Sequence, residues 1–358
     1  MDNKGLLFIP DISGFTRFVT ETEIDHSRLI IQELLELLIN ANQTELEISE
    51  VEGDAILFYR FGEAPALQEL YTQVARMFSD FHRHLQAYDA LRFCQCKACI
   101  SAVNLSLKVI THYGEFTRYN VKNFQKLIGK DVIVAHQLLK NDIDQHEYWL
   151  VTNALPQSDP PTGFTGWMEW NSSQKHTESG AIPFHYAPLS PLKKELLPSP
   201  PLGLELSKRT KVLSASREYE THIITLFHAS GGFQYRHRWQ EGVKKVEELT
   251  HFLPRVGMKS RRILENGEAV VYASSYSFHP EKTQFSETDE QKRNSTYFTL
   301  EKIDETRTRL TVDLYIRKNI FREIAFKLWK KKKLKAALER SLANLEKLVK
   351  EIHVETEY

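Results

Sequence analysis

The spacing of apolar residues divides the first part of the chain into strands and helices. The continuous apolar run at 6–9 is typical of a buried strand, and the alternation at 105–111 indicates another one. Segments 16–43 and 65–91 carry apolar residues at helical spacing and predict amphipathic helices. Segment 50–58 lies between them and predicts a hairpin with a Gly-Asp pair at its tip. The predicted order is therefore strand, helix, hairpin, helix and strand.

The pattern changes in the second part of the chain. Segment 216–224 predicts a strand, and 225–241 predicts a short helical region. Segments 270–278 and 310–316 alternate between an apolar or aromatic face and a polar face, which indicates antiparallel strands. A sheet with one apolar face needs a cover. The terminal segment 318–352 can supply it, because its apolar residues fall at helical spacing over about 50 Å of helix.

A proline-rich segment separates these two patterns. Residues 191–204 include four of the thirteen prolines and are predicted to form a linker. The chain has 358 residues, of which 41% are hydrophobic, so it can bury two substantial cores. We therefore expect an α+β protein with one domain at 1–190 and a second at 205–358.

Charge and composition restrict the classes of partner. The chain has 47 basic and 47 acidic side chains, so no net field steers it toward nucleic acid. No apolar run approaches the ~18 residues that a transmembrane segment needs, and no signal-peptide pattern precedes the first strand. All three cysteines lie between positions 94 and 99, which argues against a secreted disulfide framework. These observations predict a soluble cytoplasmic protein without a nucleic-acid partner.

Two aspartates stand beside glycines at predicted turns. Asp11 follows the first strand and precedes Gly14, whereas Asp54 follows Gly53 at the hairpin tip. Glycine lets neighbouring backbone amides approach whatever a carboxylate holds. Carboxylate oxygens are the ligands that Mg²⁺ and Mn²⁺ prefer, and these ions commonly bridge to phosphate. The pair therefore predicts a hard-cation site.

Asp-Ile-Ser-Gly-Phe-Thr at 11–16, followed by Gly-Asp-Ala at 53–55, resembles the catalytic domain of class III nucleotidyl cyclases. The resemblance covers about half of the chain and implies a ferredoxin-like core. It implies that Asp11, Asp54 and the backbone of Ile12 hold two metal ions, which clamp a nucleoside triphosphate. It further implies nucleotide contacts from Ser13, Gly14, Phe15, Thr16, Glu50 and Lys126. The natural form that it implies is a head-to-tail homodimer.

The resemblance fails at the residues that assist catalysis. The family pattern Gly-x-x-Val-Asn-x-Ala-x-Arg corresponds to 129–137, where Ile133 replaces the Asn and Gln137 replaces the Arg. An aliphatic side chain cannot bond a ribose, and a neutral amide cannot replace a guanidinium on a phosphate. Glu50 matches an acidic purine-reading position of guanylyl cyclases, but Lys126 departs from the family pattern, so ATP and GTP both stay open.

The three cysteines form a Cys-x-Cys-x-x-Cys motif at Cys94, Cys96 and Cys99. Three thiolates at this spacing can occupy three corners of a tetrahedral zinc site. The fourth ligand is then sought among the nearby histidines, which are His82, His84 and His112. The alternative is that the cysteines are reduced thiols that pack as small hydrophobic side chains.

The layout of the second part resembles the START-like helix-grip fold, also called the polyketide cyclase/Bet v 1-like superfamily. The segments 239–243 and 254–257 resemble the stretch between its short helices and its second strand. The resemblance implies a sheet wrapped around a long helix, with a cavity for a small apolar ligand. Candidate lining residues are Tyr272, Tyr276, Phe278, Tyr297 and Trp329. An ordinary aromatic core is the alternative.

Two functions follow from these features. The favoured one is a non-catalytic sensor or adaptor, in which a degenerate cyclase-like domain binds a nucleotide, metal or partner and a START-like domain binds an apolar molecule. It rests on Ile133 and Gln137. The alternative is an active metal-dependent cyclase regulated by the ligand of the second domain, and it rests on Asp11, Asp54 and Glu50.

Overall fold

A computed structural model describes residues 3–94, 96–155, 167–177, 180–196, 206–249, 255–319 and 331–352. The chain divides into two compact units. The first consists of Met1–Ala90 and Gln95–Ser199, and the second of Leu91–Cys94 and Pro200–Tyr358. Of the predicted linker at 191–204, residues up to 195 belong to a 3-10 helix, η2 (Ser190–Glu195), and residues 197–204 lie outside the described residues.

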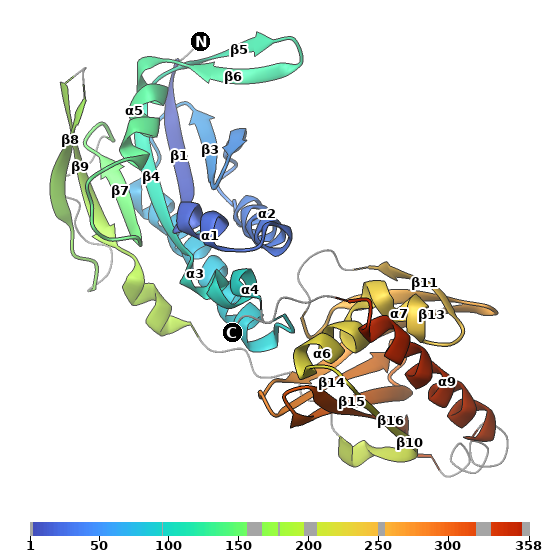
Figure 1. Ribbon diagram of the computed structural model, residues 1–358. Helices are drawn as coiled ribbons and strands as arrows, with labels where there is room; N and C mark the ends of the chain where they lie inside the picture. Colours follow the sequence, from blue (N-terminus) through green and yellow to red (C-terminus); the bar gives the residue numbers. More distant parts are fainter. Residues whose placement is uncertain are drawn as a thin grey trace. The chain divides into compact units, whose positions relative to one another are not determined.

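The first unit is built on a seven-stranded sheet with strand order β2-β3-β1-β4-β7-β9-β8 (Figure 1). The strands are β1 (Lys4–Ser13), β2 (Glu47–Glu52), β3 (Ala55–Phe61), β4 (Ser106–Glu115), β7 (Tyr148–Thr152), β8 (Asn171–Thr177) and β9 (Gly180–Pro188). The helices are α1 (Phe15–Glu21), α2 (Ile24–Asn40), α3 (Leu67–Leu91), α4 (Lys97–Ser101), the 3-10 helix η1 (Ala102–Asn104) and α5 (Lys130–Leu139). A separate hairpin consists of β5 (Thr117–Val121) and β6 (Phe124–Ile128).

The predicted ferredoxin-like core is confirmed. β1 lies between β3 and β4 and is antiparallel to both, with β2 beyond β3. Successive strand residues point to opposite faces, and Leu7 and Ile9 pack in a cluster with Val132, Ala135 and Leu138 of α5. Helices α2 and α3 lie on the other face (Figure 1). The end of β1 and the turn of the β2–β3 hairpin, which carry the two aspartates, therefore lie next to each other, because β1 and β3 are neighbouring strands.

The helix predicted at 16–43 is two helices. α1 ends at Glu21 and α2 begins at Ile24, because Thr22 and Glu23 adopt extended backbone conformations. Thr22 Oγ1 donates to the carbonyl oxygen of Phe18 at 2.6 Å, which closes the end of α1. The break gives the chain a change of direction directly before His26.

The second unit is also α+β, and its sheet has the strand order β10-β16-β15-β14-β13-β12-β11. The strands are β10 (Arg209–Tyr219), β11 (Val243–Glu248), β12 (Lys259–Leu264), β13 (Gly267–Ser277), β14 (Lys282–Asp289), β15 (Asn294–Asp304) and β16 (Arg307–Arg317). The helices are η3 (Leu206–Lys208), α6 (Ile223–Gly231), η4 (Phe233–Tyr235), α7 (Arg236–Trp239) and α9 (Lys331–Val349). All neighbouring strands are antiparallel, and the first strand pairs with the last.

The terminal helix covers this sheet, as the pattern predicts. Leu342, Leu345 and Leu348 of α9 share one core cluster with Phe298 and Leu310 of the sheet. The helix does not begin at 318, because β16 continues to Arg317, and residues 320–330 lie outside the described residues. The strand predicted at 216–224 ends at Tyr219, and α6 begins at Ile223. The helix-grip layout is confirmed with these shifts.

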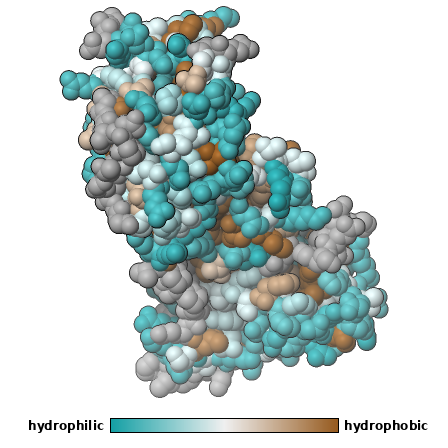
Figure 2. All heavy atoms as spheres, turned by 90° about the vertical axis from the view of Figure 1, so that its left-hand side faces the viewer, coloured by the Kyte–Doolittle hydropathy of each residue, from teal (hydrophilic) through white to brown (hydrophobic). Residues whose placement is uncertain are grey.

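Hydrophilic side chains cover most of the face drawn in Figure 2. Among the described helices, none is both long enough and apolar enough to cross a membrane.

Candidate functional site

A cleft of about 940 Å³ opens in the first unit where β1, the β2–β3 turn and α5 meet. Its size is that of a small-molecule site, since ligand pockets typically measure about 300–1,000 Å³. The residues that line it are Ile9, Asp11, Ile12, Ser13, Gly14, Phe15, Thr16, Arg17, Glu50, Glu52, Gly53, Asp54, Ala55, Leu57, Lys108, Val132, Ile133, His136, Gln137, Leu139, Lys140 and His146. Every residue predicted to hold the hard cation or the nucleotide lines this cleft except Lys126.

Asp11 and Asp54 are brought together by strand register. Asp11 pairs with Ala55 across β1 and β3, so Asp54 lies one residue away, and the backbone N–H of Ile12 donates to the carbonyl oxygen of Asp54 at 3.1 Å. Asp11 is buried. Burial raises the pKa of Asp54 to about 6, and the negative charge of Asp11 acts in the same direction. The two carboxylates therefore share one electrostatic environment.

Lys108 is a residue of this site that the sequence reasoning missed. It pairs with Asp11 across β1 and β4, and its Nζ lies 3.3 Å from Asp11 Oδ1. The same Nζ donates to the carbonyl oxygen of Leu139 at 3.2 Å. Burial raises the pKa of Asp11, and Lys108 opposes that rise. The alternating pattern of 105–111 does not distinguish Lys108, because only the strand register places it opposite Asp11.

The turn from β1 into α1 borders the two carboxylates. Gly14 has φ 89°, a left-handed conformation that favours glycine, and its carbonyl oxygen accepts from the N–H of Phe18 at 3.0 Å. Ser13 is buried, and its hydroxyl has no hydrogen-bond partner among the described residues. Phe15, Thr16 and Arg17 continue the wall from the first turn of α1. The predicted nucleotide-contacting run at 13–16 thus faces the same space as the aspartates.

The two predicted purine-contacting residues contact each other. Lys126 of β6 forms an ion pair with Glu50 of β2, and the hydrogen bond between them raises the pKa of Lys126. Glu50 also lies 3.6 Å from Nε2 of His136 on α5. Glu50 lines the cleft, whereas Lys126 does not. Lys126 is therefore connected to the cleft only through its ion pair with Glu50.

The wall formed by α5 carries the residues that depart from the cyclase pattern. Ile133 and Gln137 both line the cleft, and Ile133 is 60% exposed. The cationic side chains on the lining are Lys108, Arg17 and Lys140, together with two histidines. Arg17 Nε pairs with Glu21 at 3.2 Å. The lining also carries four carboxylates, those of Asp11, Glu50, Glu52 and Asp54, so an anionic group would need a bound cation beside it. The α5 positions offer an aliphatic chain and a neutral amide.

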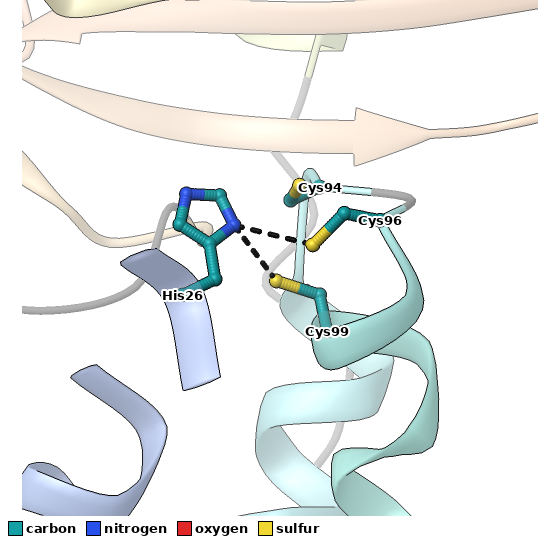
Figure 3. A group of neighbouring side chains, drawn as sticks. All are labelled: His26, Cys94, Cys96 and Cys99. Carbon is teal, nitrogen blue, oxygen red and sulfur yellow. Dashed lines mark hydrogen bonds between the residues drawn. The ribbon is translucent and has the colours of Figure 1, made fainter. Parts of the chain in front are cut away.

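The cysteine motif meets a histidine that the sequence reasoning did not select. The fourth residue is His26, in the first turn of α2, and its ligand atom and those of Cys94, Cys96 and Cys99 all lie within 4.8 Å of one another (Figure 3). His26 Nδ1 is 3.3 Å from the Sγ atoms of both Cys96 and Cys99. The hydrogen bond with Cys96 raises the pKa of His26, although burial opposes it.

The predicted fourth ligands lie elsewhere, so that prediction was wrong. His112 contacts Thr152 Oγ1 through Nδ1 at 2.7 Å and Asp131 Oδ1 through Nε2 at 2.9 Å. His84 Nε2 lies 3.0 Å from Glu33 Oε1, and burial lowers the pKa of His82 to about 4. Proximity in sequence selected these histidines, whereas His26 is 70 residues from Cys96.

The aromatic residues predicted to line one cavity do not share one face. Tyr276 pairs with Phe285 and packs against the core cluster under α9, whereas Tyr272 pairs with Thr288 and Tyr297 pairs with Ser286. Phe285 and Ser286 are consecutive, so Tyr276 and Tyr297 face opposite sides of the sheet. Tyr297 contacts Tyr315, Phe278 is 37% exposed, and Trp329 lies outside the described residues.

Comparisons with known sequences extend over part of the chain. A family described as "Protein of unknown function (DUF2652)" matches residues 31–148. The uncharacterized protein Rv2561/Rv2562 of Mycobacterium tuberculosis is 31% identical over 125 residues, which is 35% of this chain. The chain spans 58% of the length of that relative. The family match includes Asp54, Lys108 and the cysteines, and it begins after Asp11 and His26.

Comparisons with solved structures each cover part of the chain. A bacterial light-regulated adenylyl cyclase has 14% identity and a TM-score of 0.38, over 54% of this chain and 98% of that chain. The catalytic core of a rhodopsin-guanylyl cyclase with converted specificity, in complex with ATPαS, has 14% identity and a TM-score of 0.38, over 51% and 94%. A START superfamily protein from Mycobacterium smegmatis has 16% identity and a TM-score of 0.31, over 40% and 100%.

Proposed function

We propose that the first unit binds a nucleotide together with Mg²⁺ or Mn²⁺ in its cleft and does not cyclise it, so that the protein acts as a sensor or adaptor. One observation carries the proposal: strand register brings Asp11 and Asp54 together on the lining of a cleft whose α5 wall presents Ile133 and Gln137. Asp11 and Asp54 support binding of a metal ion and a nucleotide, whereas Ile133 and Gln137 argue against cyclisation of that nucleotide.

The donor set fits a hard cation. Asp11 and Asp54 offer carboxylate oxygens to the same space, and the backbone of Ile12 lies between them. Lys108 compensates part of the negative charge of Asp11, and its Nζ contacts the Oδ1 atom of that carboxylate. A divalent ion bound here would supply the positive charge that the phosphates of a nucleotide require. The residues that would hold it are the two aspartates and the Ile12 carbonyl group.

The rest of the lining suits an anionic ligand with a polar ring. Arg17 and Lys140 place positive charge on the lining, and the turn at 13–16 presents backbone amides and the Ser13 hydroxyl. Glu50 and His136 form a polar wall where a base would find hydrogen-bond partners. The volume of about 940 Å³ is ample for a nucleoside triphosphate.

Catalysis needs more than binding. In phosphoryl chemistry, a positioned cation that stabilises the transition state contributes about 10³–10⁵ in rate. Gln137 cannot carry that charge, and Ile133 cannot orient a ribose hydroxyl by hydrogen bonding. These two substitutions leave ground-state contacts with metal and phosphate intact, because those contacts come from β1 and the β2–β3 turn.

The test combines binding with a search for product. Thermal shift and titration calorimetry are run with Mn²⁺ alone and with Mn²⁺ plus ATP or GTP, on the wild type, Asp54→Asn and the control Asp142→Asn, whose carboxylate is exposed and pairs with Lys175. We expect a shift that Asp54→Asn abolishes and Asp142→Asn keeps, without cyclic product. Failure to bind would overturn nucleotide sensing, whereas cyclic product that disappears in Asp54→Asn would establish the active cyclase instead.

For the second unit we propose a small apolar ligand. The helix-grip topology supports the proposal, because α9 packs over one face of the sheet and the side chains between them are apolar. Native mass spectrometry of the intact protein, followed by extraction, should detect a co-purifying molecule. Protein whose mass equals that of the polypeptide and its metals alone, and which binds no fatty acid or aromatic probe, would contradict it.

We also propose that two copies of the chain form a homodimer. The β5–β6 hairpin carries exposed apolar side chains, and Phe124 is 72% exposed and Ile128 56%. In the dimer that we propose, a second copy of the chain would cover these residues. Light scattering should give the mass of a dimer for the wild type and of a monomer for Phe124→Lys, with Lys122→Ala in the same hairpin as the control. A monomeric wild type would refute it.

A further inference from the structure

The side chains of the three cysteines and His26 converge on one place, with more sulfur atoms around one nitrogen than a single hydrogen bond accounts for. His26 Nδ1 lies 3.3 Å from two sulfur atoms, and the third sulfur is within 4.8 Å of the same group (Figure 3). One imidazole nitrogen either donates one proton or offers one lone pair, so it forms one good hydrogen bond at a time. Three sulfur atoms around one nitrogen therefore point to a shared partner at their centre.

We propose that His26, Cys94, Cys96 and Cys99 bind one zinc ion in a closed, four-coordinate site. Zinc–sulfur bonds of about 2.3 Å and zinc–nitrogen bonds of about 2.0 Å place tetrahedral ligand atoms roughly 3.5 Å apart. The separations of 3.3 Å between His26 Nδ1 and the Sγ atoms of Cys96 and Cys99 are close to this value. The site is separate from the nucleotide cleft, because none of the four residues lines it.

The ligand types select the metal. Thiolate sulfur is a soft ligand that suits zinc and iron–sulfur clusters, whereas Mg²⁺ and Mn²⁺ prefer oxygen. Three thiolates and one imidazole form a complete tetrahedral set for zinc and leave no position for water, which is typical of a structural site. Cys94 and Cys99 are 4% and 0% exposed, whereas His26 and Cys96 are partly buried, so two of the four ligands are shielded from solvent.

The surrounding backbone holds the ligands in place. Cys96 precedes α4 and Cys99 lies one turn further, with the N–H of Ile100 donating to the carbonyl oxygen of Cys96 at 3.0 Å. Glu23, directly before α2, accepts from the N–H groups of Lys97 and Ala98 at 3.2 and 3.0 Å. The start of α2, which carries His26, is thereby fixed to the start of α4. Zinc would cross-link the same two elements.

The experiment measures metal content directly. Protein purified under reduction without chelators is analysed by elemental mass spectrometry, and apo protein is titrated with Zn²⁺ and Co²⁺. We expect about one zinc per chain and a cobalt spectrum with thiolate-to-cobalt charge transfer and tetrahedral bands. His26→Ala and Cys99→Ser should weaken zinc binding by at least about tenfold, since even outer-shell changes cost about 10–100-fold.

Two further variants separate ligation from folding. His26→Cys replaces the imidazole by a fourth thiolate and should restore zinc, with an added charge-transfer intensity in the cobalt form. His176→Ala removes a histidine outside the group and should leave the stoichiometry unchanged. The wild-type cobalt spectrum decides the matter even when variants fail to fold. Absence of thiolate charge transfer, or equal zinc affinity in His26→Ala and wild type, would overturn the site.

Discussion

Lys108 Nζ lies 3.3 Å from Asp11 Oδ1, across the register pair that joins β4 to β1. The ammonium group thus supplies one positive charge beside two carboxylates that would otherwise face each other without compensation. A divalent ion that binds to Asp11 and Asp54 must tolerate this charge. In the proposed metal site, the charge of Lys108 would therefore weaken the attraction for a cation.

Replacing Lys108 by Met should tighten Mn²⁺ binding. The substitution removes a unit charge that repels the ion and keeps the length of the side chain, and at an effective dielectric constant near that of protein surfaces the gain is about 1 kcal/mol or more, roughly fivefold in Kd. Electron paramagnetic resonance of Mn²⁺ titrations measures it. Lys175→Met, which removes an ammonium group that pairs with Asp142, is the control. Weaker binding by Lys108→Met would show instead that the lysine orients Asp11.

The Asp54→Asn substitution should stabilise the metal-free protein. Asp54 is partly buried next to Asp11, and their mutual repulsion is relieved when one becomes a neutral amide. Allowing for solvent screening, the gain is about 1 kcal/mol at neutral pH. Chemical denaturation in the presence of a chelator measures it. If Asp54→Asn instead lowered the stability by a similar amount, the Asp54 carboxylate would make a structural contact that asparagine does not replace.

Introducing Arg at position 137 should strengthen nucleotide binding. A guanidinium group on the α5 wall can pair with phosphate, which Gln137 cannot do, and about 1 kcal/mol corresponds to roughly fivefold tighter binding. The gain should shrink at high salt because the site is open to solvent. Titration calorimetry of Gln137→Arg against Gln68→Arg, an exposed position on α3, measures the effect. Equal affinities would place the phosphates away from α5.

The second unit contains a buried ion-pair triad that should make its stability depend on pH. Glu287 Oε1 accepts from Arg236 at 2.6 Å and Oε2 accepts from Arg262 at 2.5 Å, with Arg236 fully buried. Burial opposes the charge of Glu287, but the two guanidinium groups outweigh it and hold its pKa below the ordinary value of 4.5. The stabilisation is therefore present above pH 4.5 and is lost as the pH falls through the lowered pKa.

Glu287→Gln tests this dependence. At neutral pH it should cost about 3–5 kcal/mol, because two buried guanidinium groups lose their counter-charge, and it should flatten the acid limb of the stability curve. Glu301→Gln, in an exposed pair with Lys282, should change stability by less than about 1 kcal/mol. Denaturant midpoints measured from neutral to acid pH provide the data. If stability fell equally steeply toward acid pH in Glu287→Gln and in the wild type, the pH dependence would come from other carboxyl groups.

The sequence was sufficient for features that short-range pattern controls. Asp11 and Asp54 were predicted to meet because each follows a recognisable strand or turn, and the ferredoxin-like order then places those turns side by side. Lys108 was missed because a strand pattern identifies the apolar positions and says nothing of which polar residue lies opposite an aspartate. That information is in the register, which strand spacing does not contain.

Two errors have distinct physical causes. His26 is far from the cysteines in sequence, and only the packing of α2 against α4 joins them, so no local signal identified it. The aromatic set failed because β13 has a register shift between Ala273 and Ser275. A bulge inserts one residue and reverses the alternation, which puts Tyr272 and Tyr276 on opposite faces although their spacing is even.

The pairing of β10 with β16 has a consequence for biosynthesis. Arg209 of β10 is opposite Arg317 of β16, so β10 has no partner strand until more than a hundred further residues have left the ribosome. By contrast, β1 to β4 of the first unit are complete at Glu115. Long-range pairing slows folding, and domains nearer the N-terminus fold earlier during synthesis. The nascent first unit should thus acquire protease resistance before the second has begun to assemble.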